Sequence, residues 1–234
     1  MLDSRGFLTV PMAIILAALI IAGAVIYATG PSDRANNDQP ANTANVLDNL
    51  APVDANDHIW GSRDAAVKVV EFSDTECPFC KRFHYTMKNI MAEYAESGQV
   101  AWVYRHFPID SLHPKARKES QALECAADLG GNEKFWLYLD RLFEVTPSNN
   151  GLDLNELPNI ASYVGLDRSK FEACLGSSKF LDVIQADYDE AVKSGARGTP
   201  FSVVVAADGQ KFSLDGAQPY SAVKQIIDAA LSAK

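Results

Sequence analysis

The 234-residue chain has little positive charge, few cysteines and no internal repeats. Its 21 Lys and Arg residues are outnumbered by 30 Asp and Glu residues, which gives a formal net charge of −9. This acidic balance argues against nucleic acid as a partner, because a phosphate backbone is also negative. Without repeats or blocks of like charge, we expect about 180 residues beyond the N-terminal region to share one hydrophobic core.

Metal-ligand spacing is also missing. No two of the four histidines form an H-x(3–5)-H pair: His58, His84, His106 and His113. A zinc site built on two cysteines needs two more ligands, and Cys125 and Cys174 stand alone and far apart. The sequence therefore predicts no metal site and no cofactor. An even number of cysteines is compatible with two disulfides, which fit an oxidising compartment outside the cytoplasm.

Apolar residues dominate the start of the chain. Phe7–Ala28 carries no charge and is long enough to cross a bilayer as a helix. We expect a short tail at 1–6, a transmembrane anchor at 7–28 and a flexible tether at 29–51, where Asn, Asp, Pro, Ala and Ser predominate. The alternative is a signal peptide cleaved after a small-residue triplet, Ala22-Gly-Ala24 or Ala28-Thr-Gly30, which would give a secreted protein.

The motif Cys77-Pro-Phe-Cys80 lies where an apolar strand meets an amphipathic helix at 81–96. Pro78 suits the first helical position, because its missing N–H would have no partner there. Cys77 is then the cap residue, and the helix dipole favours its thiolate. Cys80 lies one turn inside, close enough to attack a mixed disulfide at Cys77. The pair is predicted to be a redox-active disulfide, with Cys77 as nucleophile and Cys80 as resolving thiol.

The hydrophobic pattern predicts an α/β fold with inserted helices. Strands at 67–72 and 99–105 flank the motif helix and form a right-handed parallel unit. Five helices are then expected, at 114–129, 132–145, 156–164, 168–175 and 179–193. Two strands joined by an Asp-Gly turn, and a last helix, end the chain at 201–206, 211–214 and 220–231. The predicted order is βαβ, a helical insertion at about 111–195, then ββα.

Three groups of residues in this order resemble the DsbA-like thiol–disulfide oxidoreductases, which have a thioredoxin fold with an inserted helical domain. Val69-Val-Glu-Phe-Ser-Asp74 precedes the cysteine motif. Arg105-His-Phe-Pro108 is followed by His113-Pro114, and Gly198-Thr-Pro-Phe201 begins the third strand. The resemblance covers 52–234, and the chain is similar to the membrane-tethered branch of the family.

The resemblance implies roles for three further residues. Pro200 matches a cis-proline that faces the cysteines, and the backbone of Thr199 would pair with an extended substrate. Glu71 matches a buried acid that serves proton transfer, and burial would raise its pKa. From the residues alone, Thr199-Pro200 is equally an ordinary trans turn. The alternative for Glu71 is a strand-end carboxylate that reaches solvent.

Phe79 departs from the family pattern, because the best-known oxidases carry a histidine between the cysteines. Phenylalanine donates no side-chain hydrogen bond to a thiolate, so the resemblance defines the chemistry better than its direction. We expect a monomer that donates disulfides to exported proteins, with its N-terminus in the cytoplasm and its domain outside. The resemblance implies a quinone-linked membrane partner that recycles the pair. The alternatives are a disulfide reductase or isomerase, and a non-enzymatic carrier that holds a soft metal ion through the same cysteines.

Cys125 and Cys174 are predicted to form a structural disulfide within the helical insertion. Each lies in a segment with helical periodicity and half-buried character. The alternative is a pair of free buried thiols, since cysteine packs well as a small apolar group.

Overall fold

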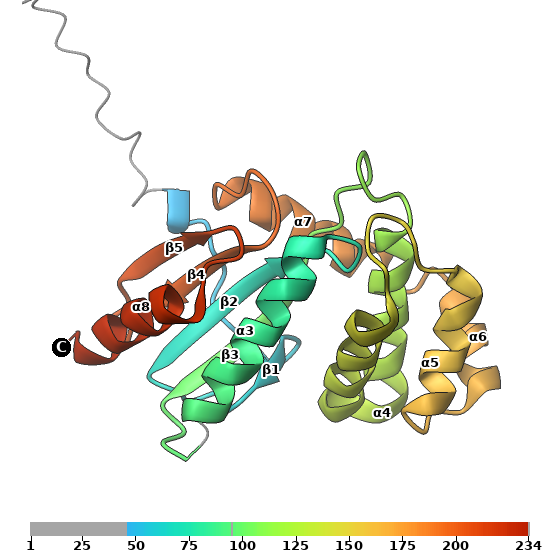
Figure 1. The fold of residues 1–234 in the computed structure, drawn as a ribbon, viewed down its shortest axis with the longest axis horizontal. Coiled ribbons are helices and arrows are strands. Elements are labelled where there is room, and N and C mark those ends of the chain that lie inside the picture. The colour runs from blue at the N-terminus through green and yellow to red at the C-terminus, as the bar shows by residue number, and fades with distance from the viewer. Residues whose placement is uncertain (1–45, 95, 234) are drawn as a thin grey trace, which may run out of the picture. The chain divides into compact units, whose positions relative to one another are not determined.

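A computed structural model of the chain describes residues 46–94 and 96–233 (Figure 1). The tail predicted at 1–6, the anchor predicted at 7–28 and most of the tether lie outside these residues. Within the described part of the chain, no helix combines the length and apolar character needed to cross a membrane.

Five strands form one mixed sheet in the order β1-β3-β2-β4-β5. The central strand, β2 (Val67–Ser73), runs parallel to β3 (Val100–His106) and antiparallel to β4 (Phe201–Val205). Antiparallel strands close both edges, β5 (Lys211–Asp215) beside β4 and β1 (His58–Trp60) beside β3. The middle strands are rich in Val and buried on both faces, as expected for a sheet covered by helices on each side.

Helices cover the two faces of the sheet (Figure 1). α3 (Pro78–Tyr94) and α8 (Tyr220–Ser232) pack on the face that carries Val69 and Trp102. α7 (Leu181–Lys193) packs on the opposite face. Each of these helices presents an apolar stripe to the sheet, and this burial holds the layers together.

The remaining helices gather beside α3 and form the insertion (Figure 1). They are α4 (Ala116–Val145), the short 3₁₀ helix η1 (Leu154–Glu156), α5 (Leu157–Tyr163) and α6 (Arg168–Gly176). The two helices expected at 114–129 and 132–145 are continuous except for a break at Gly131, whose φ of 73° favours glycine. α7 belongs to the predicted insertion by sequence, but it covers the sheet.

The segment before β2 is more ordered than the sequence predicted. Leu47 and Leu50 are 4% and 5% exposed and join the core on the α7 side of the sheet. The Asn49 side chain donates a hydrogen bond to the carbonyl oxygen of Lys193 at 2.8 Å. Residues 46–51, assigned to the tether, therefore pack on the domain, because two leucines bury enough apolar surface to hold them. β1 was also not predicted, since three residues are too few to show alternation.

Candidate redox site

The turn between β2 and α3 places the two cysteines. The Cys77 N–H donates to the Asp74 carbonyl oxygen at 3.1 Å, which closes the turn. The Lys81 N–H donates to the Cys77 carbonyl oxygen at 3.1 Å, so the first helical hydrogen bond begins at Cys77. Pro78 occupies the first helical position, as its sequence position predicted. Cys77 therefore caps the helix and Cys80 lies inside its first turn.

The two thiols are free and lie in different surroundings. Cys80 is fully buried, and burial raises its pKa well above the ordinary value. A hydrogen bond from the Cys80 thiol lowers the pKa of Cys77 to about 6, against the opposing effect of burial. The side chain of Thr199 and the backbone N–H groups of Phe79 and Cys80 also contribute to this lowered Cys77 pKa. Near neutral pH, Cys77 is thus a thiolate and Cys80 a thiol.

The Thr199–Pro200 peptide bond is cis, and it lies beside Cys77. The Cys77 thiol donates to the Thr199 carbonyl oxygen with an Sγ to O distance of 3.5 Å. Pro200 is buried and Thr199 is half-buried, directly before β4. The fold therefore brings together the two motifs that are 122 residues apart in sequence.

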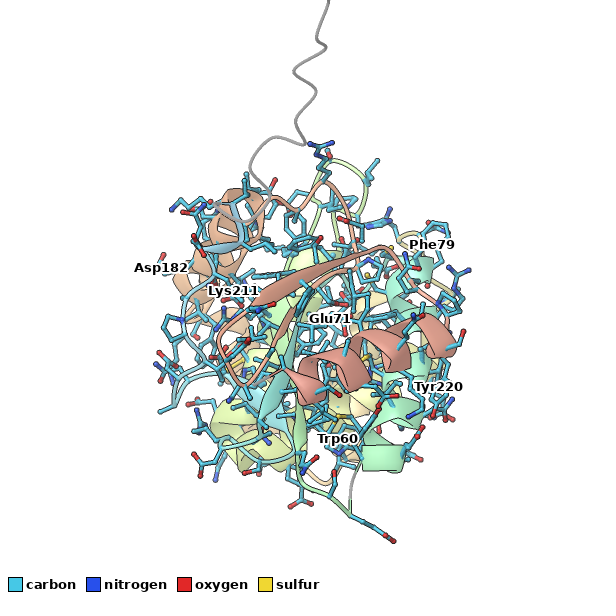
Figure 2. The ribbon with its side chains drawn as sticks, turned by 90° about the vertical axis from the view of Figure 1, so that its left-hand side faces the viewer. Trp60, Glu71, Phe79, Asp182, Lys211 and Tyr220 are labelled. Atoms are coloured by element: carbon cyan, nitrogen blue, oxygen red, sulfur yellow. A yellow bond between two sulfur atoms is a disulfide. The ribbon has the colours of Figure 1, made fainter. Side chains whose placement is uncertain are left out.

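Glu71 lies in the interior on β2, whereas Phe79 lies at the surface (Figure 2). The Glu71 carboxyl group accepts a hydrogen bond from Trp102 Nε1 at 2.9 Å. Burial raises the pKa of Glu71 to about 7, and the charge of Cys77 adds to this. The Glu71 charge in turn raises the pKa of Cys80. An acid that titrates near neutral pH beside a buried thiol can supply or accept its proton.

Replacing Glu71 with glutamine should change the pH dependence of stability. The folded-state pKa of about 7 lies above the ordinary 4.5, so the folded protein holds this proton more tightly. Ionising the buried Glu71 costs the folded state no stability below pH 4.5. The loss of stability grows as pH rises and reaches about 3 kcal/mol above pH 7. We expect the unfolding free energy of Glu71→Gln to rise by this amount relative to the wild type between pH 4.5 and pH 8. Both proteins are measured by urea unfolding in their reduced forms.

Glu133→Gln serves as the control, because Glu133 is exposed. It should show the same pH dependence as the wild type. If Glu71→Gln does so too, Glu71 ionises in the folded protein as it does in water, and a proton-transfer role loses its support.

Three acids near the motif were missed as site residues: Glu76, Glu119 and Asp74. Two of them lie within three residues of Cys77. The carboxylate of Glu76 accepts hydrogen bonds from the backbone N–H groups of Asn150 at 2.6 Å and Leu152 at 3.4 Å. Burial, followed by the neighbouring Glu76, raises the pKa of Glu119 to about 9. These contacts join the cysteine loop to the helical insertion. Neither pairing could be predicted, because its partners are distant in sequence.

The third acid explains His113. Asp74 Oδ2 lies 3.0 Å from His113 Nδ1 and accepts the Ile109 N–H at 2.8 Å. His84 Nε2 lies 2.7 Å from Asp140 Oδ1, within the core next to Trp102. Both rings are buried and held by carboxylates, so each is part of the packed interior.

Cys125 and Cys174 are joined by a disulfide between α4 and α6, with an S–S distance of 2.01 Å. The bond lies within the insertion, where the sequence placed it. It spans 49 residues of the chain.

A family model described as Thioredoxin matches residues 54–229. The chain belongs to the thioredoxin family. DsbA2 of Pseudomonas aeruginosa has the same fold, with a TM-score of 0.64 and 27% identity, and the match covers 78% of this chain and 98% of that chain. BdbD of Bacillus subtilis in its oxidised form gives a TM-score of 0.68 at 22% identity, covering 78% of this chain and 96% of that one. This thioredoxin-family chain therefore has a DsbA-like fold, that of a thiol–disulfide oxidoreductase.

A relative of a different kind shares part of this thioredoxin-family sequence. Na(+)/H(+) antiporter NhaA 3 of Salinispora tropica is 32% identical over 160 residues, which is 66% of this chain. The match covers 22% of that protein, so the chain spans about a fifth of the length of this curated relative.

Proposed function

We propose that the chain is an extracytoplasmic thiol–disulfide oxidoreductase that donates disulfides to exported proteins. The observation that carries this proposal is the contrast between the two thiols. Cys77 caps α3 and is stabilised as a thiolate, while Cys80 is buried and keeps its proton. Stabilising the thiolate stabilises the reduced pair, which makes the Cys77–Cys80 disulfide a stronger oxidant.

In the proposed reaction, a client thiolate attacks Sγ of Cys77 in the oxidised pair. The Cys77–Cys80 bond breaks, a client–Cys77 disulfide forms, and Cys80 leaves and takes up a proton. Glu71 is the buried acid that supplies this proton. A second client thiolate attacks the client sulfur and releases Cys77 as a thiolate. Two electrons pass from the client to the pair, and the client leaves with a disulfide.

The backbone before β4 is the proposed binding place for the client. The Thr199 carbonyl oxygen lies 3.5 Å from Cys77 Sγ, at the end of a strand. An extended client segment that pairs with Thr199 would bring its cysteine to Cys77, in the manner of strand addition. Phe79, two residues after Cys77, has an exposed ring that would offer an apolar contact to a client sequence.

Location and recycling belong to the same proposal. Phe7–Ala28 would anchor the chain with its N-terminus in the cytoplasm and the domain outside, and cleavage of this segment is the alternative. The disulfide between Cys125 and Cys174 supports an oxidising compartment. The reduced pair would pass its two electrons to a quinone-linked membrane protein. We propose that the chain works as a monomer.

A reductase is the rival function. A thiol at a helix N-terminus has a pKa between about 3.5 and 7.5, and this range includes oxidants and reductants. With a pKa of about 6, Cys77 lies inside it. A metal carrier is less well supported. Soft ions favour a methionine near the cysteines, but Met87, the nearest one after the motif, lies on α3 with its side chain buried in the hydrophobic core.

Trapping the resting redox state in cells tests the direction. We expect alkylation after acid quenching to show Cys77 and Cys80 mostly as a disulfide, because a donor is reoxidised after each transfer. A glutathione buffer titration should give a reduction potential well above the about −270 mV of thioredoxin. The double variant Cys77→Ala/Cys80→Ala provides the blank for thiol counting. Mostly free thiols together with a thioredoxin-like potential would replace the oxidase with the reductase.

A further inference from the structure

Three ionisable side chains that the redox chemistry does not use converge beside the edge of the sheet. His58 comes from β1, His106 from the end of β3 and Glu124 from α4. The ligand atoms of all three lie within 4.8 Å of one another. They are 48 and 18 residues apart from their neighbours in the cluster, so no spacing motif in the sequence announced them.

The imidazoles point at a single carboxylate oxygen. His58 Nε2 and His106 Nε2 each lie 2.8 Å from Glu124 Oε1. Both rings are oriented by packing on α4, and His58 stacks on Phe135 with ring centres 3.6 Å apart. This is the donor set of two imidazole nitrogens and one carboxylate that binds zinc and related divalent ions in proteins.

The cluster differs from the His84–Asp140 pair. Asp140 accepts from His84 and is also paired with Lys88. Within the described residues, the ion pairs of Glu124 are those with the two histidines. Nearby, Arg105 is paired with Asp57 and Glu190 instead. A divalent cation would therefore meet a carboxylate that no lysine or arginine neutralises.

Small shifts would convert the hydrogen-bonded cluster into a coordination site. Zinc binds nitrogen and oxygen at about 2.0–2.1 Å, which places tetrahedral donors about 3.3 Å apart. Each imidazole nitrogen would move about 0.5 Å away from Glu124 Oε1, since both now lie at 2.8 Å. Each ring must also carry its proton on Nδ1. Among the described residues, His106 Nδ1 is buried without a hydrogen-bond partner, so its N–H in the metal-binding tautomer would need water as its acceptor.

A pocket of about 310 Å³ supplies the open position. His58, Glu124 and Asp187 line it, together with residues of the segment before β1. Asp187 presents a second carboxylate, which also accepts the backbone N–H of His106 at 2.9 Å. A cation at the cluster would thus have access to water or to a further oxygen ligand, as catalytic and exchangeable zinc sites do.

We propose that His58, His106 and Glu124 form a binding site for a zinc-like divalent metal ion. The ion would join β1, β3 and α4, and so tie the sheet edge to the helical insertion. The proposed metal site does not depend on the direction of the redox chemistry, because none of its three ligands belongs to the cysteine site. Metal binding should therefore raise the temperature of unfolding while it leaves the Cys77–Cys80 exchange unchanged.

Equilibrium dialysis with Zn²⁺ tests the site on the full chain, purified with chelator and fully oxidised so that no cysteine can bind. We expect one ion per chain. His58→Gln and Glu124→Gln should each weaken Zn²⁺ binding at least tenfold and abolish the rise in unfolding temperature. His84→Gln removes a buried, carboxylate-bound histidine outside the cluster and should leave Zn²⁺ binding unchanged. Co²⁺ should give the visible absorption of a site with nitrogen ligands.

Three results would overturn the proposal. The first is that the oxidised chain binds no Zn²⁺, and the second is that His58→Gln binds it as tightly as His84→Gln does. Binding only to the reduced chain would assign the ion to Cys77 and Cys80 instead. Circular dichroism of each variant shows that it is folded, and His58→Gln is the mildest change, because the His58 side chain is 13% exposed.

Discussion

Cys80→Ala protein isolated from cells will carry client proteins in mixed disulfides at Cys77. Without Cys80, the mixed disulfide loses the neighbouring thiol that would otherwise attack it and release the client. Cys80→Ala removes the hydrogen bond that lowers the Cys77 pKa most, but Cys77 remains a nucleophile because the N–H groups at the start of α3 still stabilise its thiolate. Non-reducing gels should show high-mass adducts that collapse on reduction, and mass spectrometry should identify the clients.

The matched variant Cys77→Ala should trap no clients, because Cys80 is fully buried and keeps its proton. The double variant sets the background. Adducts on Cys77→Ala but not on Cys80→Ala would reverse the assigned roles. Equal, low levels of adducts on both variants would argue against exchange with proteins altogether.

Removing the second disulfide will cost the domain about 4 kcal/mol of unfolding free energy. The bond between Cys125 and Cys174 closes a loop of 49 residues, and cross-linking such a loop removes entropy mainly from the unfolded chain. Cys125→Ala/Cys174→Ala should therefore unfold at much lower urea concentration with a similar slope. Its Cys77–Cys80 exchange rate, measured where the variant is folded, should match the wild type.

Thiol counting supplies the control for this prediction. Denatured Cys77→Ala/Cys80→Ala protein should show no titratable thiol before reduction and two after it. Two thiols before reduction would mean that the bond is not formed in the protein as purified. If the bond is present in the wild type and the variant loses less than about 1 kcal/mol of unfolding free energy, the bond does not serve mainly to stabilise the fold.

The redox pair could be located from the sequence because its chemistry is local. The signals lie within a few residues of one another. Periodicity shows the strand and the helix, and the residue types show the cap, Pro78 and the resolving cysteine one turn later. The helices of the insertion and the β4–β5 hairpin could be predicted for the same reason. Their signals repeat over one or two turns of helix or a few alternating residues.

Features that depend on contacts between distant residues could not be predicted in this way. β1 is three residues long, and it is defined by its pairing with β3. Residues 46–51 appeared to be a tether, because only the core on the α7 side shows what Leu47 and Leu50 bury. The links of Glu76 to the insertion likewise exist only after α4 and the following loop have packed.

The sequence by itself determined the family, the cysteine pair and the order of the elements from β2 onward, because local patterns encode secondary structure and short motifs indicate its chemistry. Tertiary structure decided which residues share a site. It placed Thr199 beside Cys77 and buried Glu71 where its pKa rises. It also brought His58 and His106 to one carboxylate oxygen of Glu124. Distances and burial between segments arise only when the layers pack, and pKa values and coordination depend on both.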